Sequence, residues 1–248
     1  MSKVLIVTGG GRGIGAATAR LAGSRGFSVA VNYYSNAEAA NSVVQDIEAA
    51  GGKAIAVQAD VSTEEGVTSL FQTVDEKLGT PDGLFANAGT LTEYRPIQEV
   101  PLADLERTWR GNISGPFLCA REAAKRMSTT SGGKGGSIVI NSSAAARIGG
   151  AHGMLAYAAS KGATDTFTLG LSIELGGQGI RVNAVRPGLI ETTFHDLTGD
   201  LERLKKLVGG VPMGRTGTAD EVAEAVLWLL SDEASYVSGT HVDVTGAR

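Results

Sequence analysis

Short runs of β-branched and aliphatic residues alternate with longer stretches of helical hydrophobic spacing along the whole chain. The predicted strands are Val4–Val7, Ser28–Val31, Ala54–Val57, Gly83–Ala86, Ser137–Ile140, Arg181–Val185 and His241–Val244. These runs are continuously apolar rather than alternating. That pattern is typical of strands buried on both faces of a parallel sheet.

Helices fit between the strands. They are predicted over Gly13–Ser24, Ala37–Ala50, Glu64–Leu78, Leu102–Met127, Leu155–Gly176 and Ala219–Ser231. Thr63 is a suitable N-cap for the third of them, and Gly79 ends it. The alternation predicts a single α/β domain over residues 1–248: a doubly wound, mostly parallel sheet of about seven strands with helices on both faces, the Rossmann fold.

Three irregular segments follow predicted strands, near 90–101, 142–154 and 188–218. Each begins at the carboxyl end of its strand, which is the edge where open α/β sheets bind ligands. Long loops at that edge usually serve as lids or substrate walls. We therefore expect the substrate to be held by these three loops.

Composition narrows the class of protein. An apolar fraction of 42% supplies a core without staples, and the single cysteine, Cys119, excludes a disulfide framework and a zinc cluster. No metal site is predicted. The net charge of -4 does not favour nucleic-acid binding. Because neither a signal-peptide pattern nor a bilayer-length apolar run is visible, we expect a cytoplasmic enzyme with no membrane partner.

The first predicted strand runs directly into Thr8-Gly9-Gly10-Gly11-Arg12-Gly13-Ile14-Gly15, and a helix follows. Glycines permit a tight turn and let the main chain approach a pyrophosphate, which sits against the positive end of the helix dipole. The sequence therefore predicts a dinucleotide site that includes Gly9, Arg12, Gly13, Ile14 and Gly15.

The end of the second strand bears on which dinucleotide is bound. An NAD-preferring site usually carries Asp or Glu there, about 20 residues after the glycines, to bind the ribose 2′-hydroxyl. Here the stretch reads Asn32-Tyr33-Tyr34-Ser35-Asn36, with no acid before Glu38. Arg12 can attract a 2′-phosphate, and Ser35 and Asn36 can donate hydrogen bonds to it. The pattern favours NADP(H), and NAD(H) stays possible.

Tyr157 and Lys161 are four residues apart in a predicted helix, so their side chains share one face. A free tyrosine has a pKa of about 10, too high for acid–base work at neutral pH. A neighbouring ammonium favours the phenolate and lowers the pKa. We therefore expect Lys161 to lower the pKa of Tyr157.

Several further motifs occur in a fixed order. They are Thr8-Gly9-x-x-x-Gly13-x-Gly15, Asp60-Val61, Asn87-Ala88-Gly89, Asn112, Ser142-Ser143, Tyr157-x-x-x-Lys161 and Pro187-Gly188-x-Ile190-x-Thr192. Together they closely resemble the short-chain dehydrogenase/reductase family, in its branch with subunits near this length, over essentially the whole chain. The resemblance implies an oxidoreductase that transfers a hydride between NADP(H) and an alcohol or carbonyl substrate.

The resemblance also implies roles for the catalytic residues. Tyr157 would be the general acid in reduction and the base in oxidation, and Lys161 would also bind the nicotinamide ribose. Ser143 would stabilise the substrate oxygen, and Asn112 would hold a water that links Lys161 to solvent. Ser143 matches the second serine of the family's usual pair. Ser142 is the alternative, because the segment up to Tyr157 is one residue longer than in many members.

The same resemblance distributes the cofactor contacts. Asp60 and Val61 would lie at the adenine, and Asn87, Ala88 and Gly89 would lie beside the adenosine ribose. Pro187 and Gly188 would lie under the nicotinamide. Ile190 and Thr192 would lie near its carboxamide and the pyrophosphate. A homotetramer is implied as well, built by the two long helices through apolar residues such as Phe117, Cys119, Phe167 and Leu171.

Two other functions compete with this hypothesis. One is a non-catalytic dinucleotide-binding sensor on the same fold. Such a protein would have little reason to keep Asn112, Ser143, Tyr157 and Lys161 together. The other is an epimerase or dehydratase on the same scaffold. The sequence does not name the substrate: the loops exclude neither a sugar, a ketone nor a 3-oxoacyl thioester.

Overall fold

The computed structural model describes residues 2–150, 153–192 and 207–248. It contains one sheet of seven strands in the order β3-β2-β1-β4-β5-β6-β7, and every neighbouring pair is parallel. The strands are β1 (Val4–Val7), β2 (Ser28–Tyr33), β3 (Lys53–Gln58), β4 (Gly83–Ala86), β5 (Gly136–Asn141), β6 (Ile180–Pro187) and β7 (His241–Val244). The predicted doubly wound fold is confirmed. Its strand order reverses between β1 and β4, the position where such sheets bind ligands.

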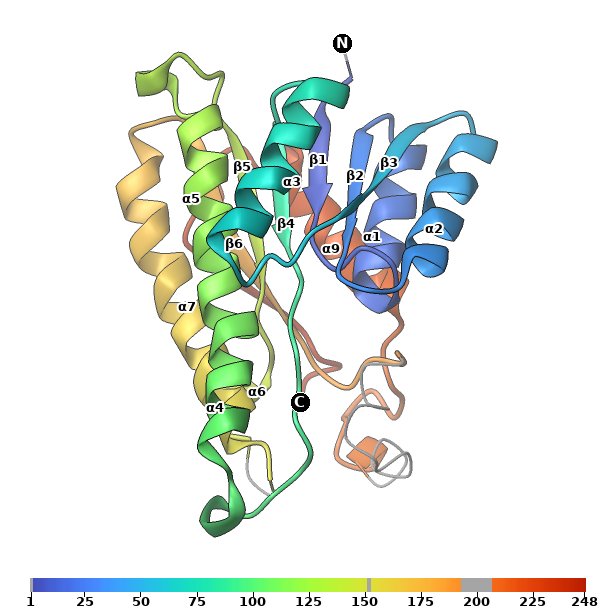
Figure 1. Ribbon diagram of the computed structural model, residues 1–248. Coiled ribbons are helices and arrows are strands. Elements are labelled where there is room, and N and C mark those ends of the chain that lie inside the picture. The colour runs from blue at the N-terminus through green and yellow to red at the C-terminus, as the bar shows by residue number, and fades with distance from the viewer. Residues whose placement is uncertain (1, 151–152, 193–206) are drawn as a thin grey trace.

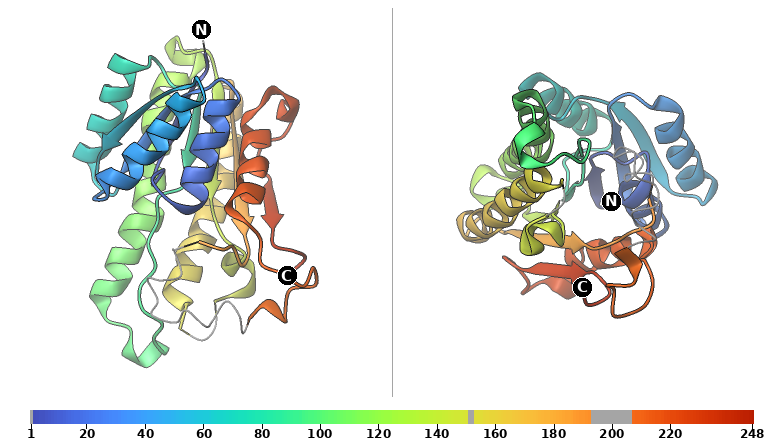
Figure 2. Two further views of the ribbon diagram at one scale, coloured as in Figure 1. Left: turned by 90° about the vertical axis from the view of Figure 1, so that its right-hand side faces the viewer. Right: turned by 90° about the horizontal axis from the view of Figure 1, so that it is seen from below.

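Helices cover both faces of the sheet (Figures 1 and 2). One face carries α1 (Gly13–Ser24), α2 (Ala37–Ala49) and α9 (Ala219–Leu230), and the other carries α3 (Glu64–Lys77), α5 (Gly115–Met127) and α7 (Leu155–Gly176). Alternate residues of β1 enter the two cores: Leu5 faces α1 and α9, whereas Ile6 faces α3 and α5. Burial on both sides explains why the strands are continuously apolar.

The long helix predicted over Leu102–Met127 is helical throughout but not regular. It consists of α4 (Leu102–Trp109), a π-helical segment η2 (Arg110–Ser114) and α5. The physical reason lies at Asn112, whose amide bonds to the main chain of Thr90: Oδ1 accepts from the Thr90 N–H at 2.7 Å and Nδ2 donates to its carbonyl at 2.9 Å. Single π turns of this kind are frequent at functional sites.

The loops contain short elements that hydrophobic periodicity did not predict. They are η1 (Ile97–Glu99), η3 (Thr129–Ser131), α6 (Ala145–Ile148) and η5 (Asp232–Ala234). The predicted N-cap Thr63 is confirmed, since its hydroxyl accepts from the Gly66 N–H at 3.1 Å. Of the predicted loop at 188–218, residues 193–206 lie outside the described residues. Across the described ranges, no helix combines the length and apolarity needed to cross a membrane.

Candidate active site

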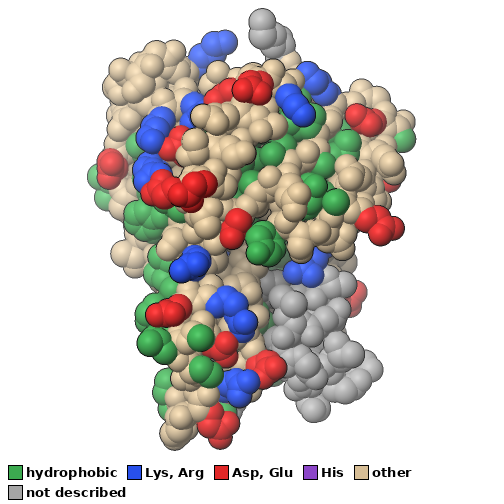
Figure 3. All heavy atoms as spheres, in the orientation of Figure 1, with side chains coloured by type: hydrophobic (Ala, Val, Ile, Leu, Met, Phe, Trp, Pro, Cys, Tyr) green, Lys and Arg blue, Asp and Glu red, His purple; other side chains and the backbone are tan. Residues whose placement is uncertain are grey.

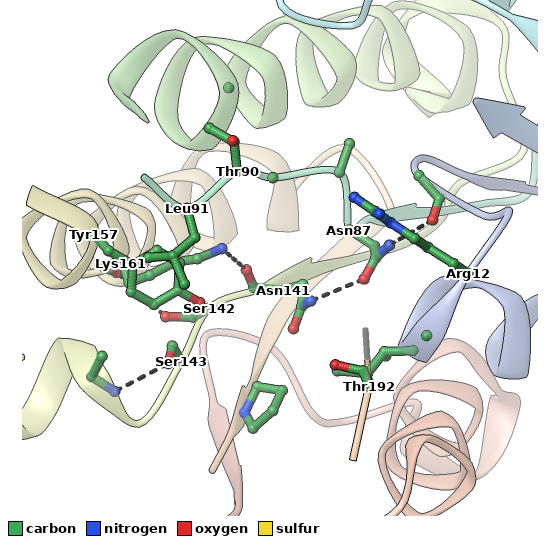
Figure 4. A pocket seen from close by; sticks show the side chains of 18 of the residues that line it. Arg12, Asn87, Thr90, Leu91, Asn141, Ser142, Ser143, Tyr157, Lys161 and Thr192 are labelled. Atoms are coloured by element: carbon green, nitrogen blue, oxygen red, sulfur yellow. Dashed lines mark hydrogen bonds between the residues drawn. The ribbon is translucent and has the colours of Figure 1, made fainter. Parts of the chain in front are cut away.

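A cavity of about 1230 Å³ opens at the carboxyl ends of the strands. The glycine-rich turn after β1 lines one side of it, and Tyr157 and Lys161 of α7 line the other (Figure 4). Nearly all the residues predicted from the sequence line this cavity. Gly15 and Asn112 are the exceptions, and both lie directly behind its wall.

The turn after β1 has room only for glycine at its critical positions. Gly9 and Gly13 have φ angles of +60° and +52°, in the left-handed region that favours glycine. A Cβ on Gly15 would meet the carbonyl oxygen of Gly9 and would lie 2.6 Å from Nδ2 of Asn87. The main chain of the turn therefore faces the cavity at the positive end of α1, which is a ready anion site. Arg12 projects from this turn into the cavity (Figure 4).

Asn87 ties the turn to the end of β4. Its Nδ2 donates to the carbonyls of Thr8 and Gly9 at 2.9 and 3.2 Å. In return, the Thr8 hydroxyl accepts from the N–H groups of Asn87 and Ala88, both at 2.9 Å. The side chain of Asn87 is thus committed to the fold, and Ala88 and Gly89 present main chain to the cavity where the ribose contact was predicted.

At the end of β2, too, some side chains stabilise the fold and others face the cavity. Asn32 is buried and accepts from the Gly9 N–H at 3.3 Å, while its Nδ2 donates to the Ala59 carbonyl at 3.1 Å. Asn36 accepts from the Ala39 N–H at 3.0 Å and so caps α2. Arg12, Ser35 and Asn36 all line the one cavity, as the predicted 2′-phosphate contacts require.

Tyr157 is buried, with 9% of its surface exposed. Burial raises its pKa to about 12, and a hydrogen bond with Ser143 acts in the opposite direction. The expected lowering of this pKa by Lys161 is wrong for the protein in this structure, because desolvation of the phenolate outweighs every favourable contact. Tyr157 therefore keeps its proton at neutral pH, which is the form a general acid needs.

Lys161 is the second buried titratable group of the site, 4% exposed. Its Nζ donates to the main-chain carbonyl of Asn141 at 2.6 Å and lies 5.6 Å from the centre of the Tyr157 ring. Burial lowers the pKa of Lys161 to about 8, and the attraction of Asp165 opposes this shift. Lys161 therefore gains or loses its charge in the pH range of ordinary enzyme assays.

The two adjacent serines point to different partners. Ser142 is buried and its hydroxyl donates to Oδ1 of Asp165 at 2.6 Å. Ser143 lines the cavity beside Tyr157, and its hydroxyl accepts from the Ala145 N–H at 3.1 Å. This geometry favours Ser143 over Ser142 as the residue that meets a substrate oxygen.

Asn112 is fully buried, and its amide is committed to the Thr90 main chain and to the Ser160 hydroxyl, 3.0 Å from Nδ2. The side chain therefore fixes the start of the 90–101 loop on α7. The predicted water contact would need another atom of Asn112. A Cβ on Gly89 would lie 2.9 Å from the Asn112 amide oxygen, so this packing requires glycine there.

Several residues that line the cavity were not among the site residues predicted from the sequence. The cavity is also lined by Leu91, Tyr94, Asn141, Met154 and Leu189. Asn141 carried a signal, since it is a polar residue directly after the apolar run Ile138–Ile140 at the end of a strand. Asp165 carried another, one helical turn after Lys161 on the same face. Among the described residues, no group of three His, Cys, Asp or Glu side chains is arranged to hold a metal ion.

The fold and cavity define a dinucleotide-binding α/β protein with a buried tyrosine–lysine pair. Comparison with known proteins gives the family. Residues 9–246 match the family model described as enoyl-(acyl carrier protein) reductase. The chain is 46% identical over 245 residues to the uncharacterized oxidoreductase YgfF of Escherichia coli (strain K12), covering 99% of each protein.

Solved structures agree. A double mutant of a short-chain dehydrogenase/reductase of Serratia marcescens superposes with a TM-score of 0.91 at 32% identity, covering 99% of this chain and 97% of that one. A 7α-hydroxysteroid dehydrogenase in complex with NADH and 7-oxo glycochenodeoxycholic acid gives 0.90 at 34% identity, covering 98% and 93%. The chain belongs to the short-chain dehydrogenase/reductase family of oxidoreductases.

Proposed function

We propose that the protein is an NADP(H)-dependent oxidoreductase that interconverts an alcohol and a carbonyl, with Tyr157 as the general acid and base. The observation that carries this proposal is the convergence of Tyr157, Ser143 and Lys161 on the cavity that the glycine-rich turn also lines. A sensor that only binds a dinucleotide has no need of a protonated phenol and a serine hydroxyl at that place.

The residues present fit a bound dinucleotide. The glycine turn leaves a cradle that a Cβ would fill, and Thr192 lies against it, 3.3 Å from where a Cβ on Gly13 would be. The turn and the start of α1 would hold the pyrophosphate, and Lys161 would reach the nicotinamide ribose. When bound, the nicotinamide supplies or accepts the hydride.

The protein's own groups then handle the proton. In reduction the Tyr157 hydroxyl donates its proton to the carbonyl oxygen while the carbonyl carbon receives the hydride. The Ser143 hydroxyl donates a hydrogen bond to the same oxygen and stabilises its developing negative charge. In oxidation Tyr157 must first lose its proton. Because the pKa of Tyr157 is about 12, alkaline pH favours oxidation.

The preference for NADP(H) rests on electrostatics. Arg12 places a cation at the cavity, and the segment Asn32–Asn36 lacks a carboxylate that would repel a 2′-phosphate. The 7α-hydroxysteroid dehydrogenase structure holds NADH, so NAD(H) is the alternative cofactor for this chain.

The lining beside Tyr157 bears on the substrate. Leu91, Ala145 and Met154 pack with Tyr157 in one apolar cluster at the cavity. Apolar walls favour a substrate whose carbonyl is carried on an apolar body. The similar hydroxysteroid dehydrogenase structure holds 7-oxo glycochenodeoxycholic acid. Cyclic ketones are therefore the first class to test, before sugars and 3-oxoacyl thioesters.

The test is NADPH consumption by the purified protein with a panel of these three classes. We expect one equivalent of NADPH to be oxidised per alcohol formed with at least one cyclic ketone. An epimerase or dehydratase would convert its substrate with no net change in nicotinamide absorbance. A sensor would bind NADPH and consume none with any compound, and either result would refute the proposed reaction.

We also propose that the protein is a homotetramer. Phe117 of α5 is half exposed and stacks on Phe167 of α7 with ring centres 3.7 Å apart. Ile173, also on α7, is 82% exposed. Trp228 and Tyr236 expose further apolar surface on other elements. Cys119, expected at this contact, is instead buried in the core, and Leu171 packs partly against it. A monomer in light scattering at micromolar concentration would exclude the assembly.

A further inference from the structure

A chain of alternating charges runs behind the catalytic pair, from α7 through β6 and β7 to α6. Oδ2 of Asp165 accepts from Nε and Nη2 of Arg186 at 3.0 and 2.8 Å. Nη1 of Arg186 lies 3.7 Å from Asp243, and the other oxygen of Asp243 lies 3.3 Å from Nη1 of Arg147. Two acids and two arginines thus connect three successive elements, α6, α7 and β6, with the distant strand β7.

The Asp165 end of this network is the buried end. The side chains of Asp165 and Arg186 are 14% and 20% exposed, against 50% for Arg147. Oδ1 of Asp165 accepts from the Ser142 hydroxyl at 2.6 Å and lies 3.5 Å from Nε2 of His241. The Asp165 carboxyl group is therefore held by several partners, and removing it would leave those partners unpaired in a poorly solvated place.

The network reaches the candidate active site twice. Asp165 follows Lys161 by one helical turn on the same face of α7, and its charge attracts the Lys161 ammonium against the effect of burial. Ser142 directly precedes Ser143. Arg147, which donates to the Arg248 carbonyl at 2.8 Å, lies at the other end of the short segment that carries Ser143. The segment is therefore fastened on both sides.

We propose that Asp165 is a positioning residue of this site: it holds the Ser142–Ser143 segment against α7 and balances the charge of Lys161. The inference rests on the proposed roles of Ser143 and Lys161 and extends them to a residue outside the cavity. The groups that face Lys161 are Tyr157 and Asp165 on its own helix and the Asn141 carbonyl of β5. Those that face Asp165 are Arg186 of β6 and His241 of β7.

The experiment is the pH dependence of NADPH binding, followed by nicotinamide fluorescence, in the wild type and in Asp165→Asn. The amide keeps the shape of the side chain and removes its charge. Without that charge Lys161 should lose its proton at lower pH, so the alkaline limb of binding should move to lower pH. We expect equal affinity below pH 7 and about five-fold weaker binding at pH 8 to 9 in the variant.

Two further variants separate charge from stability. Asp165→Glu keeps the charge, so its alkaline limb should stay near that of the wild type. Asp75→Asn removes the partner of Arg126, 2.7 Å away, from the cluster of charged side chains that gathers over α3 and α5 (Figure 3). Asp75→Asn should lower the melting temperature and leave the alkaline limb of NADPH binding at the same pH. If the role of Asp165 were purely structural, Asp165→Asn would give this same result.

An alkaline limb of Asp165→Asn that coincides with the wild type would overturn the inference, as would an equal displacement in Asp165→Glu. The readout does not need a substrate. If the wild type reduces no carbonyl compound but its NADPH binding still responds to Asp165, the proposed reaction fails and the positioning role stands. If the wild type does not bind NADPH at all, both fail.

Discussion

The two sides of the cavity are built in different ways. The side proposed to hold the cofactor, called the cofactor side below, is made of main chain: a glycine turn whose shape is fixed by positive φ angles and by the Thr8–Asn87 contacts between β1 and β4. The side proposed to carry out catalysis, called the catalytic side below, is made of side chains, Ser143, Tyr157 and Lys161, held by contacts across the domain. The first side should therefore be sensitive to shape and the second to charge and to single functional atoms.

The two sides of the cavity also differ in how deeply their side chains are buried. Tyr157 and Lys161 are nearly inaccessible, and desolvation moves the pKa of the first up to about 12 and of the second down to about 8. Arg12 is exposed, so its attraction for a phosphate acts through water and is screened by salt. Changes on the catalytic side should therefore have larger effects than a change of one charge on the cofactor side.

The largest effect is expected for Tyr157→Phe. The variant loses the only hydroxyl proposed to donate the proton, while its ring can still fill the buried position. We expect single-turnover reduction to fall about 10³-fold and the Kd for NADPH to change by less than about three-fold. Stopped-flow rates and fluorescence titration measure the two quantities. Activity within a few-fold of the wild type would remove Tyr157 from the mechanism.

The next effect tests shape on the cofactor side. In Gly15→Ala the new Cβ would collide with the Gly9 carbonyl, so the turn must move away from its Asn87 contacts. We expect about 100-fold weaker NADPH binding together with a lower melting temperature. Gly170→Ala on α7 is the control, because a Cβ there meets nothing within 4 Å and should stabilise the helix by about 1 kcal/mol. Unchanged binding in Gly15→Ala would mean that the turn does not hold the cofactor.

Much of the cofactor side could be predicted because its signals are local. Strand, glycines and helix follow one another within Val4–Gly15, and the φ angles of Gly9 and Gly13 are the kind that a glycine motif implies. The doubly wound sheet also followed from continuously apolar runs that alternate with helical spacing. Local pattern was sufficient wherever main chain makes the site.

The catalytic side could be predicted only in part, because its properties depend on burial and on distant partners. The i, i+4 spacing indicated the Tyr157–Lys161 pair, but not the desolvation that raises the tyrosine pKa. The π-helical turn at Asn112 arises from a bond to Thr90, 22 residues earlier, which no helical periodicity contains. Arg186 looks like an ordinary surface charge in the sequence until the fold brings it to Asp165.

A smaller effect is expected on cofactor choice. Arg12→Ala removes the cation proposed to meet the 2′-phosphate, and a charge-assisted contact is worth about 1.5–3 kcal/mol. We expect the ratio of kcat/KM for NADPH over NADH to fall about ten-fold, and less at high salt. Arg20→Ala is the matched control, since Arg20 lies on the following helix and pairs with Asp46 at 2.7 Å. An unchanged ratio in Arg12→Ala would mean that residues other than Arg12 determine the cofactor specificity.

The smallest effect separates two roles of Asn36, which caps α2 through its amide oxygen and is proposed to meet the 2′-phosphate through its nitrogen. Asn36→Asp keeps the capping oxygen and places a negative charge at the cavity. We expect stability to stay within about 0.5 kcal/mol and the preference for NADPH to fall a few-fold by repulsion.

Thr63→Ala provides the comparison for this variant, because Thr63 caps α3 in the same way through the Gly66 N–H. It should lower the free energy of unfolding by about 1 kcal/mol and leave cofactor preference unchanged. If Asn36→Asp leaves the ratio of kcat/KM for NADPH and NADH as it was, Asn36 serves the fold alone. Binding of the 2′-phosphate would then depend on Arg12 and Ser35. The cofactor side would distinguish NADPH from NADH with two side chains rather than the three that the sequence suggests.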